Sequence, residues 1–213
     1  LVLVCDTTTG RPCYRPLQHE NTARMGRFSP DARLLLTAAW DSRVRIWDAT
    51  SGGPLGSVLA HPKSGIEDAC FSPDGQYVLT ACNDGMARLW SWRTGALVCP
   101  PFQHAGQVRG VCFTPDGVFV LTAARDLTAR VWEWHTGKPV TPPLSISGSG
   151  FRVITTPDAS HAFVSGEVST RVLDTITYHP RSVRVISGGT ATSVQDWPGR
   201  QNLWAVGVPP SGP

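Results

Sequence analysis

Charged residues are scarce in this sequence. They make up 16% of the 213 residues, and 19 Lys and Arg stand against 16 Asp and Glu, which leaves a formal net charge of +3. No block of five residues carries one sign of charge. Because a surface needs a strong positive field to hold nucleic acid or an anionic membrane, we expect neither as a partner.

Long apolar runs and metal-binding cysteine patterns are also missing. The N-terminal run of residues 1–4 is too short for a signal-peptide core, and no stretch approaches the roughly 18 apolar residues of a membrane helix. The six cysteines form no C-x-x-C pair and no zinc-type spacing with histidine. Cys70 and Cys112 share one local pattern, which is typical of reduced core residues. We therefore expect no metal, no cofactor and a cytoplasmic protein.

The sequence is rich in turn-forming residues and tryptophan, and it repeats itself. It contains 21 Gly, 18 Pro and 8 Trp, which favours many short strands over long helices. Four kinds of position recur with steps of 43 and 42 residues. They are Phe28, Phe71 and Phe113; Trp47, Trp90 and Trp132; Asp41, Asp84 and Asp126; and, over one step, His61 and His104.

Each period contains short apolar runs bounded by turns. The runs 34–38, 77–81 and 119–123 suit strands that are buried on both faces. The Pro-Asp-Gly sequences at 73–75 and 115–117 have the composition of tight hairpin turns. The sequence therefore predicts an all-β fold with about four strands per period.

The Gln-His or Ala-His pair, the Ser-Pro-Asp-Gly turn and the Trp47-Asp48 dipeptide resemble the WD40 repeat. The segment 136–144 further resembles bacterial WD-repeat arrays, which often follow a Ser/Thr kinase domain, although no kinase motif is present. The resemblance implies a β-propeller of four-stranded WD40 blades. Because the chain has no initiator Met and begins in mid-pattern, we expect a partial propeller or a fragment of a larger one.

The resemblance also implies an organisation by blades. The last strands of a partial blade occupy 1–20, complete blades occupy 21–61, 62–104 and 105–145, a degenerate blade occupies 146–178, and a partial blade or disordered tail occupies 179–213.

In this family a buried hydrogen-bond network of His, Thr, Asp and Trp locks each blade. The implied sets are His19, Thr37, Asp41 and Trp47; His61, Thr80, Asp84 and Trp90; and His104, Thr122, Asp126 and Trp132. A hydroxyl beside His and Asp also resembles a nucleophilic triad, but a structural network recurs in every repeat whereas a catalytic site does not. We therefore expect no catalytic residues. The degenerate blade has Ile146, Glu167 and Leu173 at the matching positions, so we expect it to open first.

Propellers of this family usually bind partners on the face that carries the turns between the second and third strands. The implied positions are those before each network Asp and those on the innermost strands, namely Trp40, Asn83, Arg125, Arg24, Glu67 and Arg109. Aromatic and Arg side chains are enriched at interface hot spots, and guanidinium groups pair with carboxylate and phosphate. The alternative is that Trp40 only packs and that the Arg side chains are only solvated.

We expect a non-catalytic scaffold or sensor that binds a protein or peptide, acidic or phosphorylated, on one propeller face. A second hypothesis is a structural segment that completes the ring of a larger WD-repeat protein such as a kinase-linked array, with the other blades of that longer chain as its partners. An enzyme with a site on the propeller face would need acid and base residues outside the networks, and the sequence offers no such cluster.

Overall fold

The structure is a computed structural model that describes residues 1–62, 65–146, 152–155, 161–165, 170–174 and 180–181 of the 213-residue chain. Every regular element in these ranges is a β-strand. The described residues accordingly contain no helix that is long and apolar enough to cross a membrane. The prediction of an all-β fold is confirmed.

The strands form four antiparallel sheets in which strands consecutive in sequence are neighbours. The first sheet contains β1 (Ala23–Phe28), β2 (Leu34–Ala39), β3 (Arg43–Asp48) and β4 (Pro54–Ala60). The second contains β5 (Ile66–Phe71), β6 (Tyr77–Cys82), β7 (Met86–Ser91), β8 (Ala96–Leu97) and β9 (Phe102–Gln103). The third contains β10 (Val108–Phe113), β11 (Phe119–Ala124), β12 (Thr128–Glu133), β13 (Lys138–Pro139) and β14 (Leu144–Ser145). The fourth contains β15 (Arg152–Thr155), β16 (His161–Ser165), β17 (Thr170–Asp174) and β18 (Pro180–Arg181). In the second and third sheets the outer strand is split in two, and both pieces pair with the third strand.

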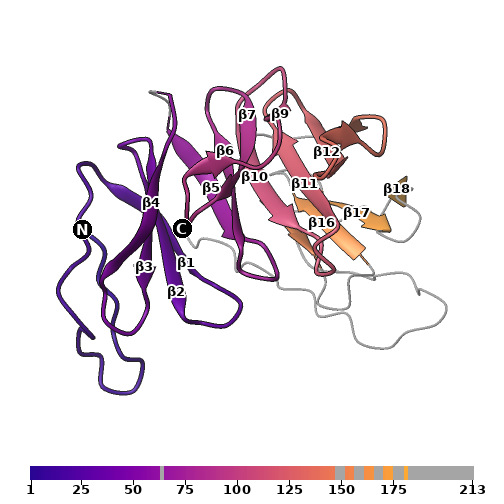
Figure 1. Cartoon of the computed structure of the whole chain (residues 1–213). Helices are drawn as coiled ribbons and strands as arrows, with labels where there is room; N and C mark the ends of the chain where they lie inside the picture. The colour runs from indigo at the N-terminus through magenta and orange to yellow at the C-terminus, as the bar shows by residue number, and fades with distance from the viewer. Residues whose placement is uncertain (63–64, 147–151, 156–160, 166–169, 175–179, 182–213) are drawn as a thin grey trace, which may run out of the picture.

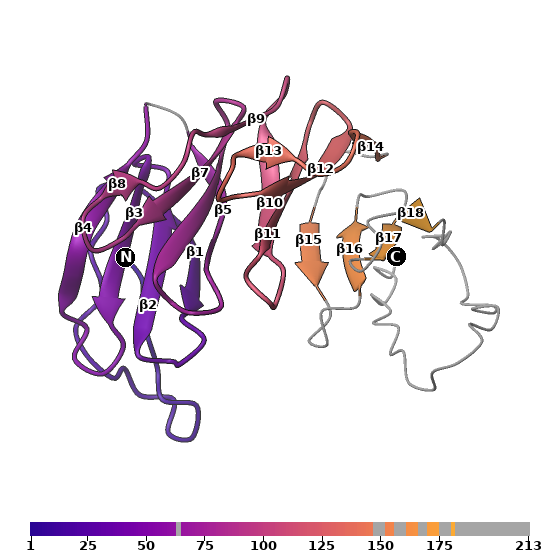
Figure 2. The same cartoon turned by 45° about the vertical axis from the view of Figure 1, so that its right-hand side comes forward.

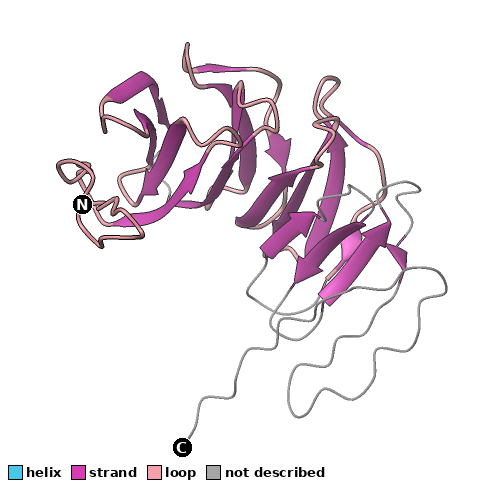
Figure 3. Cartoon of the chain, turned by 90° about the horizontal axis from the view of Figure 1, so that it is seen from below, coloured by secondary structure: helices cyan, strands magenta, loops and turns pink. Residues whose placement is uncertain are grey.

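The four sheets follow one another side by side along an open arc (Figures 1 and 3). Their first strands, β1, β5, β10 and β15, lie next to one another in that order (Figure 2). Sheets with this connectivity, repeated along an arc, are the blades of a β-propeller. The predicted partial propeller is confirmed.

The turn between the first and second strands is built in the same way in the first three sheets. In the second sheet the Ser72 hydroxyl accepts a hydrogen bond from the Tyr77 N–H (2.9 Å) and donates one to Asp74 (2.5 Å). Gly75 then turns the chain with a φ of +69°, a left-handed conformation that suits glycine. The first sheet has Ala32 at this place, with a φ of +58°, so its backbone follows the same path with a less suitable residue.

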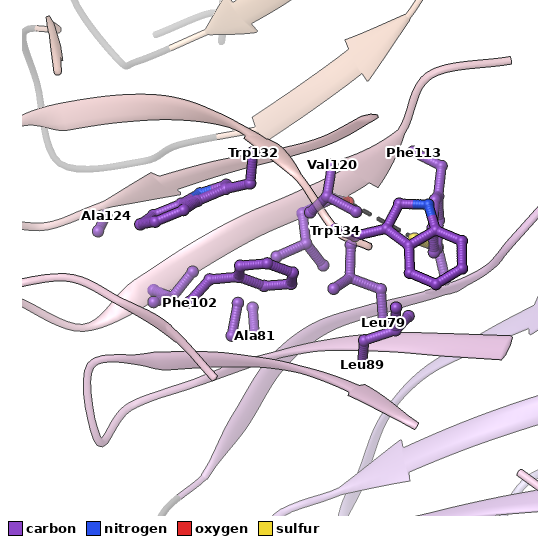
Figure 4. Close-up of a cluster of buried hydrophobic side chains, with 13 residues drawn as sticks. Leu79, Ala81, Leu89, Phe102, Phe113, Val120, Ala124, Trp132 and Trp134 are labelled. Atoms are coloured by element: carbon purple, nitrogen blue, oxygen red, sulfur yellow. Dashed lines mark hydrogen bonds between the residues drawn. The ribbon is translucent and has the colours of Figure 1, made fainter. Parts of the chain in front are cut away.

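The hydrophobic core lies between adjacent sheets. Figure 4 shows Leu79, Leu89 and Phe102 of the second sheet packed against Val120 and Trp132 of the third. Two further clusters join the first sheet to the second and the third to the fourth. Because full burial of one such side chain contributes about 1.5–3 kcal/mol, each sheet depends on its neighbours for stability.

Residues 1–17 cover the outer face of the first sheet. Val2 and Leu17 form one antiparallel bridge, and Cys5 and Pro12 form another. Val2 and Leu17 pack with Leu35 and Trp47 of the first sheet, at the place that a preceding blade would fill.

The sheets can be set beside the expected blade ranges. The first three sheets lie within 21–61, 62–104 and 105–145, whereas the fourth continues beyond 178 because β18 (Pro180–Arg181) pairs with β17. Most of the segment 179–213, for which we expect a partial blade or a disordered tail, lies outside the described residues.

Candidate functional site

Three of the residues expected to bind a partner occupy equivalent β-bulges. The pairing of the first and second strands shifts by one residue between Ala23 and Met25, between Ile66 and Asp68, and between Val108 and Gly110. The extra residues are Arg24, Glu67 and Arg109. A bulge changes the direction in which a side chain points, and bulges are frequent next to functional sites.

The three bulge residues meet in one ion-paired group. Glu67 Oε2 is 2.5 Å from Arg24 Nη2 and 2.6 Å from Arg109 Nη1, so its carboxylate joins three adjacent sheets. The Asn83 amide nitrogen donates to Glu67 Oε1 at 2.9 Å. The Glu67 side chain is only 5% exposed, and its carboxylate contacts one nitrogen of each arginine.

The other two expected residues differ from this group in their exposure. Trp40 is 59% exposed, and the guanidinium of Arg24 lies 6.0 Å from its ring centroid. Arg125 is also exposed, and its side chain forms no hydrogen bond or ion pair with the described residues. The structure therefore joins Trp40 to the bulge group through Arg24 and leaves Arg125 separate.

The expected His, Thr, Asp and Trp network is continuous in the third sheet. The Trp132 indole donates to Thr122 Oγ1 (2.8 Å), Thr122 Oγ1 is 2.7 Å from His104 Nε2, and His104 Nδ1 is 3.0 Å from Asp126 Oδ2. Because a carboxylate can only accept, His104 Nδ1 carries the proton of the neutral imidazole. The Thr122 hydroxyl then donates to Nε2.

In the first sheet the same four positions meet, but an arginine enters the network. Trp47 Nε1 donates to Thr37 Oγ1 (2.8 Å), which is 2.7 Å from His19 Nε2. Arg45 Nη1 lies 2.7 Å from His19 Nδ1, whereas Asp41 Oδ2 is 3.4 Å from it. An arginine has donors only, so we infer that Nδ1 accepts and that the imidazole proton is on Nε2.

The network of the second sheet is interrupted at the histidine. Trp90 donates to Thr80 Oγ1 (3.0 Å), but the Thr80 hydroxyl donates to the Arg88 carbonyl oxygen (3.2 Å) instead of reaching His61. His61 Nε2 is buried without a hydrogen-bond partner in the described part of the chain, and Asp84 pairs with Arg88 at 2.7 Å. Of the four residues expected here, the hydrogen bonds join only Thr80 and Trp90.

The histidines of these networks are held in the neutral form. Burial, supported by the nearby Arg88 charge, lowers the pKa of His61 to about 4. Burial is also the main reason that the pKa values of His19 and His104 are lowered. Neutral, buried and repeated histidines are suited to holding the blades together.

An arginine that follows each network Asp by four residues was not singled out from the sequence. Arg45, Arg88 and Arg130 pair across the sheet with Thr37, Thr80 and Thr122, so all three have one register. Their spacing has the same steps of 43 and 42 residues as the tryptophans, and this signal could have identified them.

The fourth sheet keeps the backbone register of a blade without its network. The Ile146 N–H donates to the Leu127 carbonyl oxygen (2.9 Å), as His61 and His104 do to the equivalent residues. Leu173 pairs with Ala162 where Trp132 pairs with Val120. Glu167 lies outside the described residues.

No group of three His, Cys, Asp or Glu side chains within the described ranges could hold a metal ion. Four-stranded sheets arranged along an arc, with repeated His, Thr, Asp and Trp positions, define a repeat protein of the β-propeller class. The sequence model of the WD domain, G-beta repeat, matches residues 16–48, 52–91 and 98–133, which together span just over half of the chain. The chain therefore belongs to the WD40 repeat family.

Two curated proteins show short similarities to this chain. A urea amidolyase from Lachancea kluyveri is 47% identical over 55 residues, and a urea amidolyase from Saccharomyces cerevisiae is 44% identical over 54 residues. These segments cover 26% and 25% of this chain but only 3% of each relative. The chain thus spans a small fraction of the length of these relatives.

Proposed function

We propose that this chain is a non-catalytic scaffold that holds a protein or peptide partner on the face carrying the β2–β3, β6–β7 and β11–β12 turns. WD40 repeats generally mediate protein interactions, and the family is generally non-catalytic. The observation that carries the proposal is Trp40, a 59% exposed tryptophan beside the guanidinium of Arg24. Tryptophan and arginine are the side chains that most often dominate binding energy at interfaces.

An acidic or phosphorylated segment is the proposed partner chemistry, and Arg125 is the cation that it would meet. Arg24 and Arg109 share the single carboxylate of Glu67, which compensates one of their two charges, whereas Arg125 is exposed and has no carboxylate partner among the described residues. A guanidinium binds carboxylate or phosphate through paired hydrogen bonds. In this proposal Trp40 supplies apolar contact area, and Arg125 favours a partner segment that carries negative charge.

The test is binding of acidic, phosphorylated and neutral peptides displayed as a library, followed by calorimetric titration of the best binder. The double variant Trp40→Ala with Arg125→Ala should bind more than tenfold more weakly while its free energy of unfolding changes little. A matched control is Val118→Ala with Arg33→Ala, which removes an exposed apolar and an exposed cationic residue at the β10–β11 and β1–β2 turns of the opposite face. Equal affinities for both double variants would refute the proposal.

One observation favours a second role, completion of the ring of a larger WD-repeat protein. Cys70 and Cys112, each one residue before the end of a first strand, are covered by the following sheet. Ile154 has the same position in β15 and is 59% exposed. An exposed isoleucine at this interface position suits a further blade.

This second role is tested by light scattering coupled to size exclusion over a concentration series. Association that grows with concentration and is reduced by Ile154→Thr would support it. A monomer at all concentrations would instead support a self-sufficient propeller.

A further inference from the structure

Arg130 differs from its two counterparts in the ion pair that it forms. Arg45 Nη1 binds Asp41 at 2.6 Å, and Arg88 Nη2 binds Asp84 at 2.7 Å. Arg130 has the same register and the same spacing from Asp126, but it forms no ion pair with any carboxylate in the described part of the chain. Its Nη1 donates instead to the Gln103 carbonyl oxygen at 3.3 Å.

Asp126 is not free to bind Arg130, because other donors occupy both of its oxygens. Oδ1 accepts from the Thr128 hydroxyl (2.7 Å) and from the Thr128 N–H (3.0 Å). Oδ2 accepts from the Ala105 N–H (3.0 Å) and from His104 Nδ1 (3.0 Å). The first and second sheets have Arg43 and Met86 at the position of Thr128, so neither has this hydroxyl.

Arg130 lines a shallow surface pocket between the second and third sheets. Pro101, Gln103, His104 and Ala105 line this pocket together with Arg130 and Trp132. The Arg130 Cζ atom is 5.8 Å from the Trp132 ring centroid, and Phe102 packs on the same ring at 5.3 Å (Figure 4). The ring is thereby fixed, and it limits the positions that the guanidinium can take.

Some hydrogen-bond donors of the Arg130 side chain have no acceptor among the described residues. Its Nε is buried and has no acceptor in the described part of the chain. The Nη2 atom also forms no hydrogen bond with the described residues, so a carboxylate that enters this pocket would supply an acceptor that the guanidinium lacks. In both counterpart blades the acceptor bound by this arginine is a carboxylate.

We propose that Arg130 is the anchor of a second binding site, which takes the carboxylate of an acidic side chain from a protein partner. A planar carboxylate can accept from two guanidinium nitrogens at once. Pro101, Gln103 and Ala105 are exposed, so the pocket is open to a side chain that projects from another protein. This proposal is independent of the partner-binding face proposed above, because the site uses neither Trp40 nor Arg125.

The probe is N-acetylglutamate N-methylamide, titrated into the isotopically labelled full chain while the arginine Nε–H signals are followed by NMR. The Arg130→Lys variant assigns the signal, and the neutral N-acetylglutamine N-methylamide is the matched control ligand. We expect the Arg130 signal to shift saturably with the acid, at an affinity at least tenfold above that for the amide. Equal shifts with both ligands, or no shift at Arg130, would overturn the proposal.

Two variants separate this site from its alternatives. Thr128→Val removes the hydroxyl on Asp126 Oδ1, so Arg130 should turn to Asp126 and the acid should bind several-fold more weakly although the arginine is still present. Trp40→Ala should leave the acid titration unchanged even if it abolishes binding on the proposed face. Retained affinity in Thr128→Val, with Arg130 shown by NMR to contact Asp126, would contradict the proposal.

Discussion

Arg45 Nη1 lies 2.7 Å from His19 Nδ1, so a permanent cation sits against a buried imidazole. Burial and then the Arg45 charge lower the pKa of His19. Replacing Arg45 by Met removes this positive charge but keeps the Asp41 carboxylate, which favours the protonated imidazole. We expect the pKa of His19 to rise, as measured by NMR titration of the imidazole carbons.

The control for this prediction is the Arg130→Met variant, in which the pKa of His104 is measured. Arg130 is the smallest of the causes that affect the pKa of His104, so the rise there should be much smaller. Equal shifts at the two histidines would mean that the Arg45 contact has no special electrostatic effect.

The stability of the chain should fall in mild acid because of His61. Its pKa is about 4 in the folded state, against 6.5 for the ordinary value, so the unfolded state binds more protons between these pH values. The free energy of unfolding should therefore decrease as the pH falls from 6.5 towards 4, by about 3 kcal/mol from this residue.

Urea unfolding at several pH values, followed by tryptophan fluorescence, measures this effect. His61→Gln cannot take up the proton and should show a shallower pH dependence, even if it is less stable at pH 7. If the variant and the unmodified chain lose stability in parallel over this range, the assignment to His61 is wrong.

Two threonines at the same position of different blades should differ in importance. Thr122 bonds both His104 and Trp132, so Thr122→Val leaves two buried polar groups without a partner and should cost about 2–4 kcal/mol. Thr80 bonds Trp90 and the Arg88 carbonyl oxygen but not His61, so Thr80→Val leaves one buried side-chain donor without a partner and should cost about 1–2 kcal/mol. Urea unfolding of the pair measures the difference, and a larger loss for Thr80→Val would contradict the network geometry.

The turn that follows each network Asp should respond in opposite ways to glycine and alanine. Leu127 has a φ of +62° and is 51% exposed, so Leu127→Gly should stabilise by about 0.5–1 kcal/mol, because strain is removed while the unfolded chain gains some freedom. Gly85 occupies the same place with a φ of +83°. Gly85→Ala should destabilise by about 1–2 kcal/mol, because its Cβ would also lie 3.1 Å from the His104 carbonyl oxygen. Thermal unfolding of the two variants is the measurement.

The repeat allowed much of the architecture to be predicted. Steps of 43 and 42 residues between equivalent Phe, Asp and Trp positions identify blades because the stacking of like units requires like residues at like places. The same steps connect Arg45, Arg88 and Arg130, so the amino-acid sequence alone marks them as equivalent. The sequence does not show what these arginines bind, because Thr128 and His104 decide whether Asp126 is available.

The contacts of the expected partner-binding residues depended on neighbouring blades. Glu67 is about one repeat away from both Arg24 and Arg109 in sequence, yet it lies within 2.6 Å of both guanidinium groups. The pattern of one blade contains no information on a bridge between three blades. For this reason the residues could be placed on one face, whereas their ion pairs could not be foreseen.

The sequence by itself determined the WD40 blades, because strand alternation, turn residues and the repeated network positions are local properties of each period. Only the tertiary structure decided which charges are compensated and which are available. Ion pairs such as Arg24 with Glu67 form between sheets, and the acceptor of each hydrogen bond is chosen by competition among all donors within reach. Those distances exist only once the sheets have packed.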